Sequence, residues 1–212
     1  MQQLFGIPFY QDKIDPSSYD KKKIVDAIEQ NYLLDTKRNN WDANDVYASN
    51  LHHSVNDFNN DRFAAVDFRS VIPLYQEKIQ EYFNSLKLNE YVSYKFRIVN
   101  YTCMTQGQFL KDHTHGCDFS AVHYIKFNSA LHLPTCYVNG NGYADYIHTV
   151  MPKLNKCLDQ QFMENSWTSR HYSVAVEEDD FVIVPGALPH LVPPFNGSDD
   201  LRMTVVVNID ID

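Results

Sequence analysis

The sequence lacks paired cysteines, long apolar runs and an excess of basic residues, and each absence excludes a class of protein. Its four cysteines form no CxxC pair and match no zinc-ribbon spacing, so we expect free thiols in a reducing compartment. No stretch approaches the roughly 18 apolar residues of a membrane span, and the first residues show no basic stretch followed by an apolar run. These features predict a soluble, cytoplasmic protein with no secretory signal and no membrane partner.

Basic residues are outnumbered by acidic ones, 18 to 27, and the formal net charge is −9. An acidic chain repels phosphate backbones, so nucleic acid is not an expected partner. The length of 212 residues fits one domain, 1–212, that can bury a core without disulfides. Aromatic residues make up 14% of the chain, which favours a β-rich core.

The N-terminal segment, residues 1–90, is predicted to be mainly helical. Ser17 and Ser18 can cap a helix that begins near Tyr19, and apolar residues then recur at helical spacing. A second amphipathic helix is expected from Val71, ending before Lys87. An Asn- and Asp-rich loop, 36–60, separates the two helices.

Alternating and continuous apolar patterns predict strands in the remaining segment, residues 91–212. They are expected at 92–101, 119–127, 173–176, 181–184 and 201–211, with turn residues between them. Helices followed by strands indicate an α+β fold, in which the helices pack on one face of a β-sandwich or barrel. An insertion, about 137–170, includes a possible short helix through Met151, Leu154, Leu158 and Phe162. Together with the loop 36–60, this insertion is expected to shape a substrate pocket. Its aromatic residues Tyr137, Tyr143, Tyr146 and Trp167 can line that pocket or pack the insertion itself.

A first candidate site lies between two predicted strands. His113 and His115 are two residues apart, so in extended backbone they point to the same side. Asp112 and Asp118 are close in sequence. Two imidazoles and a carboxylate from one loop are suitable ligands for a first-row metal such as iron.

A second candidate segment begins after the predicted strand 181–184. His190 follows a Pro-Gly turn, and Arg202 enters the last strand twelve residues later. An arginine beside a metal favours binding of a dicarboxylate, because guanidinium binds carboxylate with two hydrogen bonds. Thr204 lies on the same face of that strand and can add a hydrogen bond.

These two segments resemble the 2-oxoglutarate- and iron(II)-dependent oxygenases. The stretch Gly107-Gln-Phe-Leu-Lys-Asp-His113 is similar to the prolyl hydroxylase lead-in to the first iron ligand. A closer similarity is to a poorly characterised subgroup of these oxygenases from bacteria and phages. Its pattern corresponds here to His113-Thr-His115, Ser120-Ala-Val-His-Tyr124, Val184-Pro-Gly186, His190-Leu-Val192 and Arg202-Met-Thr204.

The resemblance implies a double-stranded β-helix, a jelly-roll of two sheets with iron near its open end. It implies that Arg202 holds the distal carboxylate of 2-oxoglutarate and that the other end of this cosubstrate chelates iron(II). It also implies a hydroxylase that forms succinate and carbon dioxide while it oxidises a peptidyl residue, an amino acid or a small metabolite.

The chain departs from the family pattern at the third metal ligand. Most members have Asp or Glu where His115 stands. Three possibilities follow: the site uses three imidazoles, Asp118 or less readily Asp112 supplies the carboxylate, or the position stays open as in related halogenases. We expect His113 and His190 as ligands, His115 next, and Asp118 in reserve.

Other polar residues have both a functional and a structural interpretation. Tyr124 and Asn100 can face the cosubstrate or pack in the core. His123 is expected to be a structural histidine, and His52 and His53 are expected to be exposed. Arg97 is expected to be an ordinary solvent-facing residue.

A different class of function also fits the sequence. A cupin-like protein that binds a metal or small molecule without turnover would retain the histidines, and the absence of a carboxylate at position 115 keeps this alternative open. A phage structural protein that reuses the fold would bind neither iron nor 2-oxoglutarate. The sequence leaves the oligomeric state open, with a homodimer as one possibility.

Overall fold

A computed structural model describes residues 6–36, 52–54, 63–86, 92–140, 142, 169–196 and 199–212. Its elements in chain order are β1 (Tyr10–Lys13), a 3-10 turn (Pro16–Ser18), α1 (Lys21–Leu34), β2 (His52–His53), α2 (Ile72–Ser85), β3 (Tyr94–Met104), β4 (Leu110–His113), β5 (Phe119–Lys126), β6 (Cys136–Val138), β7 (His171–Ser173), β8 (Asp180–Pro185), β9 (His190–Val192) and β10 (Arg202–Ile211). No helix among these residues is both long and apolar enough to cross a membrane.

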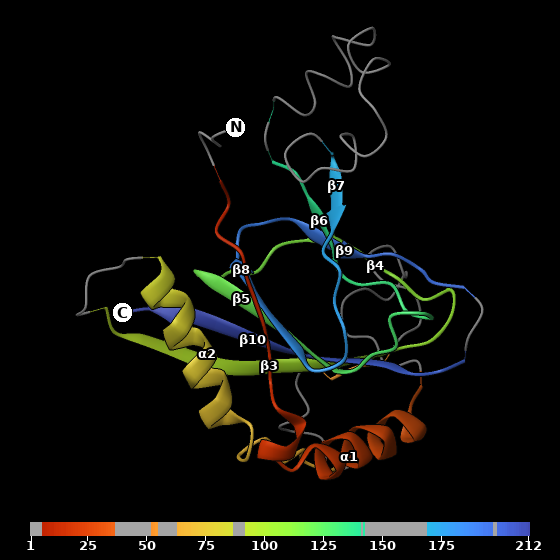
Figure 1. Cartoon of the computed structure of the whole chain (residues 1–212). Coiled ribbons are helices and arrows are strands. Elements are labelled where there is room, and N and C mark those ends of the chain that lie inside the picture. The colour runs from red at the N-terminus through yellow and green to blue at the C-terminus, as the bar shows by residue number, and fades with distance from the viewer. Residues whose placement is uncertain are drawn as a thin grey trace, which may run out of the picture.

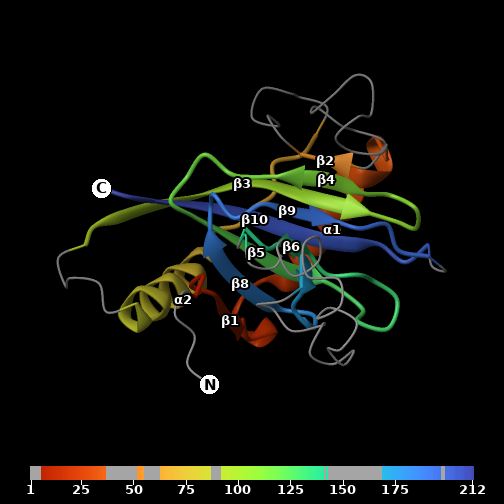
Figure 2. The same cartoon turned by 90° about the horizontal axis from the view of Figure 1, so that it is seen from above.

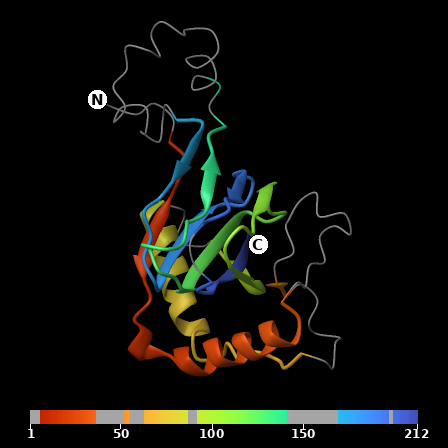
Figure 3. The ribbon, with the colours of Figure 1, turned by 90° about the vertical axis from the view of Figure 1, so that its right-hand side faces the viewer.

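The strands form two antiparallel sheets. The larger sheet has the order β1-β8-β5-β10-β3-β2, and the smaller has the order β4-β9-β6-β7. Seen from above, β4, β9 and β6 lie over β3, β10 and β5 (Figure 2). The two helices lie along the other side of the larger sheet (Figures 1 and 3). The predicted α+β class, with helices on one face of a β-structure, is confirmed.

Side-chain alternation along β10 explains this layering. Met203, Val205, Val207 and Ile209 point to the helices and belong to the largest core cluster. Arg202 and the residues at every second position after it point to the smaller sheet instead. A strand that is central in its sheet and covered on both sides buries both of its faces, which explains its continuous Val205-Val206-Val207 run.

Several sequence predictions need correction. The strand expected at 173–176 instead ends at Ser173, and the helix α1 begins at Lys21, with Ser17 and Ser18 in the preceding 3-10 turn. The N-terminal segment, expected to be mainly helical, also supplies two strands, since β1 pairs with β8 and β2 pairs with β3. Short strands of two to four residues carry too little pattern to be recognised in a sequence.

His52 was expected at the surface, but it is fully buried. Its Nδ1 lies 2.6 Å from the carbonyl oxygen of Asp35, and its ring stacks on Tyr101. The three described cysteines are free thiols, as predicted. The expected helix through Met151, Leu154, Leu158 and Phe162 lies outside the described residues.

His123 joins the helices to the larger sheet and takes no part in the candidate site. Its Nδ1 lies 2.8 Å from the hydroxyl of Tyr75 in α2, and its Nε2 lies 3.7 Å from the carboxylate of Asp179. That carboxylate also accepts hydrogen bonds from Tyr19 at 3.0 Å and Lys21 at 2.7 Å. The structural role predicted for His123 is therefore confirmed.

This network predicts acid sensitivity of the metal-free protein. Burial lowers the pKa of His123, although Asp179 opposes the shift. Below a pH of about 6.5, the histidine binds a proton in the unfolded protein but stays neutral in the folded protein. The free energy of unfolding therefore falls as the pH falls. In His123→Gln this decline should be smaller by up to about 1.4 kcal/mol per pH unit. Urea unfolding of both proteins between about pH 5 and pH 7 measures the difference, and equal slopes would contradict the assignment.

Candidate metal centre

Three histidines converge at one end of the smaller sheet. His113 ends β4 and lies directly opposite His190, the first residue of β9. His115 follows in the loop after β4. The ring centroids are 4.4 Å apart for His113 and His190, 5.1 Å for His115 and His190, and 5.5 Å for His113 and His115. One nitrogen from each ring lies within 4.8 Å of the other two. Segments about 75 positions apart in the chain thus meet at one point, as the sequence predicted.

Backbone carbonyls orient two of these rings. The Nδ1 of His113 lies 2.8 Å from the carbonyl oxygen of Lys111, and the Nδ1 of His190 lies 2.9 Å from that of Leu188. A neutral imidazole that donates through Nδ1 keeps its lone pair on Nε2. The Nε2 atoms of His115 and His190 are 3.2 Å apart. Two nitrogens that bind one ion at about 2.1 Å and at right angles are separated by about 3 Å, so this pair fits a first-row metal.

The environment keeps the three imidazoles neutral, which is the form that binds a metal. The pKa of His190 is lowered to about 3, and burial is the main cause. Repulsion by positive charge on His113 and His115 contributes to this lowering of the pKa. Burial and His113 lower the pKa of His115 to about 4, and the side chain of Asn208 acts against this shift through a polar contact. Burial also lowers the pKa of His113.

Neither candidate carboxylate belongs to this cluster. Within the described residues, the group of potential ligands at this point contains His113, His115 and His190 alone. One carboxylate oxygen of Asp118 accepts a hydrogen bond from the backbone N–H of Ile211 at 2.8 Å, which holds the side chain at the end of β10. Asp112 is exposed beside His113.

The Pro185-Gly186 turn positions the loop that carries His115. The N–H of His115 donates to the carbonyl oxygen of Gly186 at 2.8 Å, and the N–H of Gly186 donates to that of Asp118 at 2.9 Å. A Cβ atom at position 186 would lie 2.2 Å from the carbonyl oxygen of Cys117. Glycine is therefore required for the close approach of the two backbones. The sequence indicated a turn here but not this contact.

Arg202 is a buried cation with no anionic partner among the described residues. Its side chain is 1% exposed. Its Nε donates to the carbonyl oxygen of Leu133 at 3.2 Å, and its Nη1 lies 3.7 Å from the sulfur of Met104. Its Nη2 has no hydrogen-bond partner there. Since a buried charge is costly unless it is paired, this site favours an anionic ligand.

Aromatic rings form the walls around this guanidinium. Its carbon lies 5.4 Å from the ring centre of Tyr124 and 5.9 Å from that of Phe127. The hydroxyl of Tyr124 donates to Oγ1 of Thr135 at 2.9 Å and accepts from the N–H of the same residue at 3.1 Å. Tyr124 is therefore held in place beside Arg202, and its hydroxyl is already occupied.

Tyr137, one of the residues expected to line the substrate pocket or pack the insertion, connects the arginine to the histidines. It lies in β6 directly opposite His190, with ring centres 6.0 Å apart. Burial and the neighbouring Tyr124 raise the pKa of its hydroxyl, whereas Arg202 acts in the opposite direction. That hydroxyl is buried without a hydrogen-bond partner among the residues that the structure describes. Tyr137 thus offers a free donor between the two groups.

The remaining predicted residues lie on the inner face of the larger sheet. Thr204 is buried on the same face of β10 as Arg202, as expected. Asn100 lies opposite Val206, and its Oδ1 is buried without a partner among the described residues. Tyr143, Tyr146 and Trp167, which were considered for the substrate pocket, lie outside those residues.

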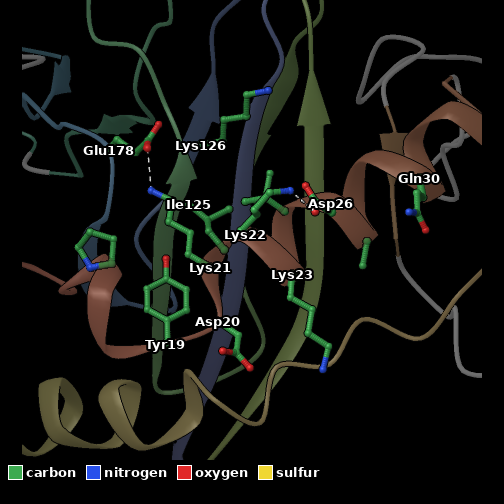
Figure 4. A pocket seen from close by; sticks show the side chains of 13 residues that line it. Tyr19, Asp20, Lys21, Lys22, Lys23, Asp26, Gln30, Ile125, Lys126 and Glu178 are labelled. Carbon is green, nitrogen blue, oxygen red and sulfur yellow. Dashed lines mark hydrogen bonds and ion pairs between the residues drawn. The ribbon is translucent and has the colours of Figure 1, made fainter.

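A separate groove of about 1040 Å³ lies between α1 and β5, and none of its lining residues belongs to the histidine cluster (Figure 4). Its lysines are paired with nearby acids. Lys21 binds Glu178 and Asp179, and Lys22 binds Asp26. These pairs leave no excess charge there to attract a ligand, so we assign no function to this groove.

The Gly186 contact gives a direct test of the metal centre. Gly186→Ala should displace the loop that carries His115 and weaken metal binding by about 10- to 100-fold. Gly116→Ala, in the same loop, is the control, because a Cβ there meets no atom within 4 Å. Anaerobic titration with iron(II) measures both variants. Equal affinities of the two variants would show that the turn does not position His115.

No protein-family model matches the chain, and no curated protein matches its sequence. Solved structures do match. A prolyl-4-hydroxylase from Pseudomonas putida has a TM-score of 0.55 at 10% identity, over 96% of this chain and 92% of its own. SnoK, a non-haem α-ketoglutarate-dependent carbocyclase from nogalamycin biosynthesis, has a TM-score of 0.55 at 13% identity, over 96% and 80%.

A third similar structure is a prolyl hydroxylase from Trichoplax adhaerens in complex with a peptide fragment of hypoxia inducible factor. It has a TM-score of 0.52 at 11% identity, over 96% of this chain and 83% of its own. α-Ketoglutarate is another name for 2-oxoglutarate. The chain therefore has the fold of the prolyl hydroxylases and of related 2-oxoglutarate-dependent non-haem oxygenases.

Proposed function

We propose that the protein is a 2-oxoglutarate- and iron(II)-dependent oxygenase that hydroxylates its substrate and releases succinate and carbon dioxide. The observation that carries the proposal is the combination of three neutral, converging imidazoles with a buried arginine that lacks an anionic partner among the described residues. The shared fold supports this assignment. The whole chain, 1–212, would form one domain, and its two antiparallel sheets would form the double-stranded β-helix of these oxygenases.

In this proposal His113, His115 and His190 hold the iron. The Nε2 atoms of His115 and His190 lie 3.2 Å apart, one nitrogen of His113 lies within 4.8 Å of a nitrogen of each, and the carbonyls of Lys111 and Leu188 fix two of the rings. Because the three ligands are neutral, more positive charge remains on the metal than in a site with a carboxylate. The dianionic cosubstrate would compensate some of this charge.

Arg202 would bind the distal carboxylate of 2-oxoglutarate through its free Nη2. The hydroxyls of Tyr137 and Thr204 would add hydrogen bonds, and Tyr124 and Phe127 would keep water away from the guanidinium. When bound, iron and 2-oxoglutarate supply the oxidising chemistry that the side chains lack. The side chains position both groups, and the substrate is a peptide or a small molecule.

Turnover separates this function from that of a cupin-like binding protein. That alternative stays open because the ligand cluster found among the described residues contains no carboxylate. Purified protein with iron(II), 2-oxoglutarate and air should form succinate, and both a chelator and His190→Ala should abolish this. Metal binding without succinate, across a substrate panel, would support the binding protein instead.

The identity of the third ligand is testable with two variants. His115→Ala should weaken iron(II) binding at least about a hundredfold, because a direct ligand is lost. Asp118→Ala should leave the affinity within about threefold and lower the free energy of unfolding by about 1 kcal/mol, since it removes the hydrogen bond to Ile211. His115→Asp should retain the metal. Anaerobic calorimetry with iron(II) gives the affinities, and the opposite order would identify Asp118 as the ligand.

Arg202→Met tests the cosubstrate site. It should weaken 2-oxoglutarate binding about a hundredfold without lowering the free energy of unfolding, because it removes a buried charge that has no anionic partner among the described residues. Lys126→Met is the control, since Lys126 lies opposite Met203 but pairs with Glu29. Titration of the iron-loaded protein with 2-oxoglutarate, without oxygen, measures both. Unchanged affinity in Arg202→Met would rule out this role.

A further inference from the structure

A row of three polar side chains crosses the inner face of the larger sheet beside His115. Asn208 in β10 is flanked directly by Ser120 in β5 and by Arg97 in β3. Directly opposed residues of antiparallel strands point to the same face. Phe119, the residue before Ser120, lies opposite Pro185 in the turn that holds the backbone of His115. Asn208 also acts against the lowering of the His115 pKa. The row therefore lies at the proposed metal centre, six positions along β10 from Arg202.

This row contains hydrogen-bond acceptors that are not satisfied within the described structure. Oγ of Ser120 and Oδ1 of Asn208 are buried without a partner there, and so is Oδ1 of the nearby Asn100. Buried polar atoms in native proteins are nearly always hydrogen-bonded. Three unsatisfied oxygens close together therefore indicate a ligand that brings hydrogen-bond donors. The ring of a prolyl residue, the substrate group named for two of the similar structures, has no such donor.

Arg97 adds a positive charge at the outer end of the row. It is exposed, and no carboxylate of the described residues lies within ion-pair distance of its guanidinium. Lys95, two residues earlier on the same strand, is instead paired with Asp212 at 2.6 Å. Because Arg97 lies directly opposite Asn208, its side chain is on the same face of the sheet as the row.

A groove opens at the outer end of this row. Arg97 and Asn100 border this groove, which has a volume of about 820 Å³ and runs along β3. Asn208 and Ser120 do not line it, so the groove reaches the row at its Arg97 end.

We propose that the substrate of this oxygenase is a free amino acid or a close analogue, with its carboxylate on Arg97 and its ammonium group directed to Asn100, Ser120 and Asn208. This inference rests on the proposed function and specifies its substrate class. A guanidinium binds a carboxylate with two hydrogen bonds, and the amide and hydroxyl oxygens accept from the ammonium group. The anchored molecule would lie beside His115 and hence beside the iron.

The test uses the whole protein loaded with iron(II) and 2-oxoglutarate in the absence of oxygen. Chelation of iron(II) by 2-oxoglutarate gives a visible charge-transfer absorption, which reports the proposed function without any substrate. A mixture of the twenty L-amino acids is then added, and separately a mixture of the corresponding amino acid amides and a proline-rich peptide. The amino acids should perturb the absorption, and the amides should need about tenfold higher concentration because they lack the carboxylate.

Variants locate the binding. Arg97→Gln should weaken the response to amino acids about tenfold, and Arg97→Lys should partly restore it. Lys95→Gln is the matched control, an exposed cation on the same strand that already has a partner, and it should respond like the wild type. Circular dichroism of each variant confirms that it is folded.

The outcomes are distinct. Absence of the charge-transfer absorption in the wild type overturns both the oxygenase and the substrate class. Presence of this absorption with a response to the peptide alone, or with an equal response in Arg97→Gln and Lys95→Gln, overturns only the inference about amino acids. Binding that depends on both the carboxylate and Arg97 supports it.

Discussion

The structure depends on the strict alternation of side chains along β10, which is paired on both edges and covered on both faces. Four apolar residues on one face hold the helices, and Arg202, Thr204 and Asn208 on the other face line the site. A shift of one residue in register would exchange these two sets, placing a guanidinium under the helices and apolar side chains at the metal centre. Fold and site are therefore specified by the same strand pairing and cannot vary independently.

The electrostatics of the site are unbalanced in the protein alone. Three imidazoles are kept neutral by burial, and the guanidinium of Arg202 is enclosed without an anion among the described residues. Each arrangement is unfavourable for an empty protein and favourable for one that holds a metal and a dicarboxylate. Bound groups would thus contribute to the stability of the fold as well as to its chemistry. The fold itself is shared with oxygenases that are only 10–13% identical in sequence, so these few side chains carry the functional argument.

Sequence patterns predicted those elements that are determined by the spacing of neighbouring residues in the chain. The long strands β3, β5, β8 and β10 and both helices follow from periodicity, and the three histidines and Arg202 follow from their motif. Asn208 could not be recognised, and neither could the contacts of Tyr137 and Ser120, because these depend on the residues that lie opposite them in neighbouring strands. Asp118 was a reasonable ligand by distance along the chain, but the backbone of Ile211 holds it elsewhere. The prediction was weakest for residues whose neighbours are determined by the pairing register of strands far apart in the chain.

The order of the strands in the larger sheet has a kinetic consequence. β10, the last element in the chain, lies between β3 and β5, and β1, the first strand, pairs only with β8. The central strand is thus synthesised after the other described strands, and β3 and β5 do not pair with each other before it is present. Such distant pairings close large loops, which slows folding. Until β10 pairs with them, β3 and β5 present open sheet edges, so chaperones that shield exposed strands should raise the yield of the native protein.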